Sequence, residues 1–165
     1  MNYVQQASVI FRNAQGDGFK LPEHVVVQMR AYTQREATQK EAGGILLGRY
    51  ILDSADAVVD QITVPMKDDV RTRINFVRSK RGHQESAAQV WSKSRGTQHY
   101  LGEWHTHPEP VPMPSRVDVM NWRRLLAHHR PDPDPLYFVI VGTRTIGAWQ
   151  GYKNGSIEML VLAAV

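Results

Sequence analysis

The sequence predicts an α/β (α+β) fold in which a single mixed β-sheet is flanked by helices. Short apolar runs of strand length alternate along the chain with longer stretches in which apolar residues recur at helical spacing. The 165 residues are 42% hydrophobic, enough for one sizeable core, and no repeat, low-complexity segment or linker divides them. We therefore expect one domain over 1–165.

The N-terminal half is expected to contain one helix among four strands. Val25, Val26 and Met29 recur roughly at helical spacing, and Pro22 stands in the first turn, where its missing N–H is not needed. Glycines open the apolar run that begins at Glu41, which indicates a strand that another backbone approaches closely. The expected elements are strands over 9–11, 41–51, 57–65 and 74–77 and a helix over 21–38.

The C-terminal half is expected to contain two helices and four strands. Gly96 ends the first helix, and Ser115 is a good N-cap for the second, which the prolines at 131–135 stop. Further prolines at 108–114 forbid regular strand pairing there. The expected elements are helices over 84–95 and 115–130 and strands over 98–107, 136–143, 147–152 and 157–165.

Composition limits the chemistry that the chain can perform. Because it contains no cysteine, it forms no disulfide or thiolate metal site and has no thiol nucleophile. The formal net charge of +4 is mildly basic, which fits nucleic acid, an acidic protein partner or no specific partner. No apolar run is long enough to span a bilayer, and the N-terminal residues do not resemble a signal peptide. We expect a cytoplasmic protein without a membrane partner.

The stretch 105–118 carries the clearest chemical pattern. Side chains two apart in a strand point to the same side, so His105 and His107 would project together and hold one ion. Asp118, in the first turn of a helix capped by Ser115, would close the site. Two imidazoles and one carboxylate suit a catalytic zinc ion, although other divalent metals also use these ligands. A His-X-His pair by itself is more often two surface histidines.

Two motifs together resemble the signature of the JAMM zinc metalloproteases, also called MPN+ or JAB. His-X-His-Pro, six residues and Ser-X-X-Asp run without a gap from His105 to Asp118. Upstream, the segment from Glu41 to Gly48 resembles the family's strand that reads Glu-X-X-Gly-X-Leu-X-Gly. The resemblance covers 21–143, over which the order of the elements also fits.

The resemblance implies a fold related to that of the cytidine deaminases. It also implies hydrolysis of peptide or isopeptide bonds after the C-terminus of ubiquitin or a ubiquitin-like protein. One catalytic Zn²⁺ would be held by His105, His107 and Asp118. Glu41 would act as general base, and Ser115 would donate a hydrogen bond to the developing oxyanion.

Within the family, the chain resembles compact bacterial members. It lacks the cysteine that some eukaryotic members use for a second, structural zinc, and 102–108 is a familiar bacterial form of the motif. Stand-alone members of this kind resemble the peptidases encoded beside ubiquitin-like, E1-like and E2-like proteins in antiphage (CBASS-like) operons, where they remove a conjugated protein from its targets. This implies a protein substrate with a C-terminal tail. The basic segment 66–81 is the candidate for binding that tail.

Several alternatives stay open. Other bacterial members process sulfur-carrier proteins, and many MPN-fold proteins are non-catalytic scaffolds that have lost the metal ligands present here. DNA-repair-associated bacterial proteins share the His-X-His-Pro and Ser-X-X-Asp motif, so a nucleic-acid-associated role is a further alternative. The glycine-flanked Glu41 favours peptidase chemistry over that role. Glu103, on the strand face of His105, is a candidate for orienting a ligand imidazole, although such a carboxylate is more often solvated.

Overall fold

The computed structural model describes residues 7–128 and 135–164. The helices are α1 (Glu23–Arg30), α2 (Lys80–Lys93) and α3 (Arg116–His128). The strands are β1 (Val9–Arg12), β2 (Gly18–Leu21), β3 (Gly43–Tyr50), β4 (Ala57–Ile62), β5 (Val70–Thr72), β6 (Asn75–Val77), β7 (His99–Thr106), β8 (Leu136–Val141), β9 (Ile146–Gly151), β10 (Ile157–Met159) and β11 (Val161–Ala164). None of the helices in these two ranges is long and apolar enough to cross a membrane.

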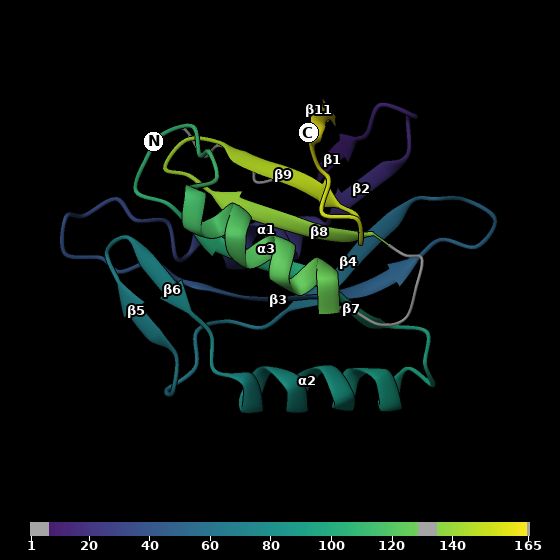
Figure 1. Cartoon of the computed structure of the whole chain (residues 1–165), viewed down its shortest axis with the longest axis horizontal. Helices are drawn as coiled ribbons and strands as arrows, with labels where there is room; N and C mark the ends of the chain where they lie inside the picture. The colour runs from purple at the N-terminus through teal and green to yellow at the C-terminus, as the bar shows by residue number, and fades with distance from the viewer. Residues whose placement is uncertain (1–6, 129–134, 165) are drawn as a thin grey trace.

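One nine-stranded mixed sheet forms the body of the molecule, in the order β10-β9-β8-β7-β3-β4-β2-β1-β11 (Figure 1). The β7–β8 and β2–β4 pairs are parallel, and the other pairs are antiparallel. β10 and β11 stand at opposite ends of this order, yet only Leu160 separates them along the chain. Because one residue spans less than 4 Å, the two edges must come together, so the sheet curls on itself. The predicted single mixed sheet flanked by helices is confirmed.

Strand β8 shows how the sheet divides the interior into two cores. Tyr137 and Val139 belong to the cluster that contains the buried side chains of α1. Phe138 and Ile140 alternate with them and pack in the second cluster with Trp122 of α3. Every residue of β8 is buried, because the sheet is covered on both faces. Helix α2 lies against β3 and β7, and its residues share a pocket with those of α3.

Two expected elements are divided or shortened in the structure. The stretch 157–165 forms two strands rather than one, because Leu160 donates its N–H to the Ala148 carbonyl and turns the chain from one sheet edge to the other. The helix expected over 21–38 covers only Glu23–Arg30. The polar segment that follows is a loop, in which the buried Gln34 amide donates to backbone carbonyls outside any helix.

Two strands and one helical turn were missed. Residues 18–21 form β2, which pairs with β1 across a turn at Gly16, where φ is +92°. The expected strand over 74–77 is confirmed as β6, and its unpredicted partner is β5. Helix α2 begins at Lys80 rather than 84, because its first turn contains no apolar side chain and adds nothing to the apolar periodicity.

Candidate metal and catalytic site

Two histidines stand at the end of the central strand β7. His105 lies opposite Gly43 of β3 and Ile140 of β8, so backbone pairing on both sides fixes its position. The N–H of His107 donates to the Val141 carbonyl at 3.0 Å, which extends the pairing beyond the last residue of β7. The Nε2 atoms of the two buried imidazoles are 3.0 Å apart.

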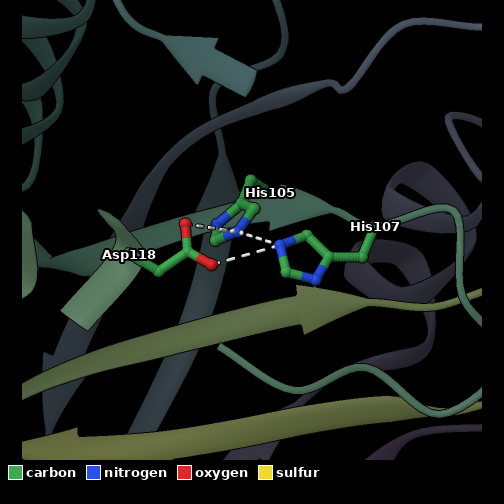
Figure 2. A group of neighbouring side chains, drawn as sticks. All are labelled: His105, His107 and Asp118. Carbon is green, nitrogen blue, oxygen red and sulfur yellow. Dashed lines mark hydrogen bonds and ion pairs between the residues drawn. The ribbon is translucent and has the colours of Figure 1, made fainter. Parts of the chain in front are cut away.

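Asp118 approaches the histidines from the first turn of α3. Its N–H donates to Ser115 Oγ at 3.1 Å, and the Ser115 N–H donates to Asp118 Oδ2 at 2.7 Å. This reciprocal capping arrangement fixes the carboxylate and confirms Ser115 as the N-cap. Asp118 Oδ1 lies 3.3 Å from His105 Nε2, and Asp118 Oδ2 lies 3.2 Å from His107 Nε2 (Figure 2).

The three side chains have the geometry of a metal site. One ligand atom from each of His105, His107 and Asp118 lies within 4.8 Å of the others. A tetrahedral ion with bonds of about 2.0–2.1 Å holds its ligand atoms about 3.3 Å apart. The two imidazole nitrogens, 3.0 Å apart, are close to this spacing, and each lies at a similar distance from a different oxygen of Asp118, 3.3 Å for His105 and 3.2 Å for His107. The donor set therefore fits a divalent metal ion with one coordination position left for other molecules.

Glu41 lies beside this cluster because of the pairing of β3 with β7. Gly43 opposite His105 places Glu41, two residues earlier, beside His107, and Glu41 Oε1 is 3.9 Å from His107 Nε2. The Glu41 residue is only 4% exposed. The expected close backbone approach is confirmed at Gly44, where an added Cβ would lie 2.2 Å from the Thr63 carbonyl oxygen.

The ionisable groups of the site are coupled. Burial raises the pKa of Glu41 to about 7, since the attraction of His107 offsets it only in part. Burial alone would lower the pKa of His107, but hydrogen bonds with Asp118 and Glu109 outweigh burial and raise it to about 9. Burial alone would raise the pKa of Asp118, but hydrogen bonds from both imidazoles outweigh burial and hold this pKa well below its ordinary value. Carboxylates that draw positive charge onto an imidazole also attract a divalent cation.

Glu109 is a site residue that the sequence analysis missed. Its carboxylate lies 2.9 Å from His107 Nδ1 and accepts a hydrogen bond from the Met113 N–H at 3.0 Å. Glu109 therefore orients an imidazole that also faces the candidate metal position, as carboxylates often do behind metal-bound histidines. Glu103, the candidate for such a role, pairs instead with Arg78. In the sequence, the feature that pointed to Glu109 was a carboxylate two residues beyond His107, within the proline-rich stretch.

Comparison with protein families gives a match over residues 22–152 to Prok-JAB, the prokaryotic homologs of the JAB domain. The chain belongs to this family. The matched range contains all of the residues brought together around the candidate metal position, from Glu41 to Asp118. The family expected from the two motifs is therefore confirmed.

Two relatives of this JAB-family chain carry the same name. A CD-NTase/cGAS isopeptidase from Pseudomonas aeruginosa (strain BWHPSA011 / Pa011) is 41% identical over 135 residues, which cover 78% of this chain and 84% of the relative. Another from Escherichia coli (strain TW11681) is 36% identical over 130 residues, 79% of this chain and 80% of the relative. A solution structure of a protein from Desulfitobacterium hafniense has the same fold, with a TM-score of 0.51 and 23% identity over 81% of this chain and 83% of that one.

Proposed function

We propose that this JAB-family chain is a zinc-dependent isopeptidase that reverses protein conjugation in bacterial antiphage defence. The observation that carries the proposal is the convergence of His105, His107 and Asp118 beside the buried Glu41. The 41% identity to a CD-NTase/cGAS isopeptidase supports the same substrate class, a CD-NTase or cGAS-type protein joined to its target through an isopeptide bond. E1-like and E2-like proteins would form that bond, and this chain would break it.

Each residue of the site has a distinct task in this reaction. His105, His107 and Asp118 would hold zinc, which supplies a Lewis acid that activates water and polarises a carbonyl. Glu41 takes a proton from the attacking water on its carboxylate and delivers it to the leaving lysine nitrogen. The Ser115 Oγ accepts the Asp118 N–H, so its own hydrogen is available to the oxyanion that forms on the scissile carbonyl.

We assign the β5–β6 hairpin to the substrate tail. It lies directly against the candidate base, because the Glu41 N–H donates to the Thr72 carbonyl at 2.7 Å. Val70, Ile74 and Val77 of the hairpin segment are 59%, 79% and 49% exposed. Large apolar side chains exposed beside a buried carboxylate suit an extended apolar tail that leads its last peptide group to Glu41.

The basic segment 66–81 does not favour nucleic acid over a protein substrate. Arg71 and Arg73 donate to backbone carbonyls of the neighbouring loop, and Arg78 pairs with Glu103. These three guanidinium groups hold the fold together, whereas a nucleic-acid surface uses arginines directed at phosphate. The presence of every candidate metal ligand also counts against a non-catalytic scaffold.

The proposal is tested with a CD-NTase joined through its C-terminus to a lysine-containing peptide. The zinc-loaded chain should release the CD-NTase with an intact C-terminus, as followed by mass spectrometry. Glu41→Gln should lower the rate by roughly 10²–10⁴-fold, the usual contribution of a general acid–base residue, while zinc content stays at wild-type level. A chelator should abolish cleavage. A zinc-replete chain that leaves such conjugates uncut would overturn the substrate class.

A further inference from the structure

A buried amide links three segments of the site that are distant in sequence. Gln34, in the loop after α1, is 2% exposed. Its Nε2 donates to the Arg73 carbonyl of the hairpin segment at 2.8 Å and to the Gln39 carbonyl at 3.3 Å. Its Oε1 accepts the hydroxyl hydrogen of Thr106 at 2.9 Å. One side chain thus satisfies groups of the loop, the hairpin and the strand β7.

The Thr106 hydroxyl continues this connection to the residue after the candidate base. Thr106 is fully buried and lies between His105 and His107 in the sequence. Its Oγ1 accepts the N–H of Ala42 at 2.9 Å, and its own N–H donates to the Ala42 carbonyl at 2.8 Å. The backbone just after Glu41 is therefore fixed to the backbone between the two histidines.

The hairpin holds the other side of Glu41. The Glu41 N–H donates to the Thr72 carbonyl at 2.7 Å, and Arg71 Nε donates to the Glu41 carbonyl at 2.7 Å. Both polar groups of the Glu41 backbone are thus bound by the hairpin segment. Since Gln34 binds the next residue of that segment, Arg73, the same amide supports both attachments of Glu41.

We propose that Gln34 is a positioning residue, which sets the Glu41 carboxylate against the candidate metal position by joining the hairpin to Thr106. The inference rests on the proposed role of Glu41 as general base. Gln34 does not touch substrate or metal and acts through the backbone that carries Glu41. Misplacing a reacting group by about 1 Å costs as much as roughly 10²-fold in rate, so a small movement of Glu41 has a measurable effect.

The neighbouring residue provides a matched control. Thr33 is also buried, at 3% exposed, and stands in the same loop. Within the part of the chain that the structure describes, its Oγ1 has no hydrogen-bond partner. Thr33→Val therefore replaces a buried hydroxyl beside Gln34 without breaking the connection to Thr106 or to the hairpin.

The experiment compares zinc-loaded variants by steady-state cleavage of the CD-NTase–peptide conjugate and by bound zinc. Gln34→Met keeps the side-chain length and removes its donor and acceptor. It should lower kcat roughly 10- to 100-fold with little change in KM or zinc content. In a Glu41→Gln background, Gln34→Met should cause no further loss, because the group that it positions is already absent. Thr33→Val should retain wild-type kcat.

The outcomes separate the two proposals. Wild-type kcat in Gln34→Met, or an equal loss in both backgrounds, would overturn the positioning role. Full activity of Glu41→Gln would instead overturn the proposed general base. If Gln34→Met does not fold, Thr106→Ser and Thr106→Val replace it. The serine keeps the hydroxyl and should keep most of the activity, whereas equal kcat values for the two would contradict the inference.

Discussion

The site has two halves that are built in different ways. The half proposed to hold the metal, here called the metal half, comes from one short stretch, 105–118, in which a strand end and a capped helix turn bring His105, His107 and Asp118 together. The base half contains the proposed general base, Glu41, whose backbone is held by residues from the β5–β6 hairpin and by the buried network at Gln34. Local geometry defines the first half, and contacts between distant segments define the second. Changes in the metal half should therefore remove the metal, and changes in the base half should remove activity alone.

The largest effect is expected from the carboxylate of the metal half. Asp118→Asn should abolish zinc binding and lower cleavage at least roughly 10³-fold, because a metal centre supplies several kcal/mol of transition-state stabilisation. Zinc per chain, measured by inductively coupled plasma mass spectrometry alongside the cleavage rate, checks this. Glu41→Gln is the matched variant, and it should keep zinc while losing activity. Full zinc occupancy in Asp118→Asn would show that the metal is held elsewhere.

A smaller effect is expected behind the metal half. Glu109→Gln should weaken zinc binding about 10- to 100-fold, the usual effect of losing a carboxylate that orients a ligand imidazole. The matched variant is Glu103→Gln, which breaks the pair with Arg78 but touches neither histidine in the described contacts. It should leave zinc affinity unchanged. Competition with a fluorescent zinc chelator measures both constants, and equal losses in the two variants would contradict the assignment of Glu109.

The last effect is expected at the base of the hairpin, where a change acts on folding stability rather than on the metal, and it depends on pH. The fully buried Asp69 carboxylate accepts the N–H groups of Met66 and Ser79 and binds His83. Although burial acts to raise its pKa, these hydrogen bonds lower it below the ordinary value. Folding therefore favours the charged form, so the stabilisation is full above the unfolded pKa of about 3.9 and fades as pH falls through the folded pKa.

Asp69→Asn tests this at two pH values. At pH 7 the variant should be less stable by about 1.5–3 kcal/mol, the typical contribution of hydrogen bonds to a charged group. The difference from the wild type should shrink at pH 3, below the unfolded pKa of about 3.9, because the carboxyl of the unfolded chain is then mostly protonated while the native one still resists protonation. Urea unfolding of both proteins gives the two differences. If the difference in unfolding free energy stays constant or widens on acidification, the charged form of Asp69 is not the source of the stabilisation.

Agreement between sequence and structure follows the same division. The spacing of His105 and His107 and the cap at Ser115 are local patterns, and the structure brings these residues together with Asp118 as the sequence predicts. Glu109 was missed because only the folded proline-rich stretch shows that its carboxylate returns to His107. Glu103, suggested for a similar role, pairs instead with Arg78, and the sequence did not indicate this partner because it lies 25 residues earlier.

By itself, the sequence determined the family, the fold class and the candidate metal ligands. These depend on strand alternation, helix capping and two motifs, all of which act over a few residues. Only the tertiary structure decided that 157–165 divides between the two sheet edges and that the helix after β2 ends at Arg30. It also decided that Gln34 joins Thr106 to the hairpin. The reason is that a buried polar group takes its partner from whichever segment the fold brings near, and that choice has no fixed spacing along the chain.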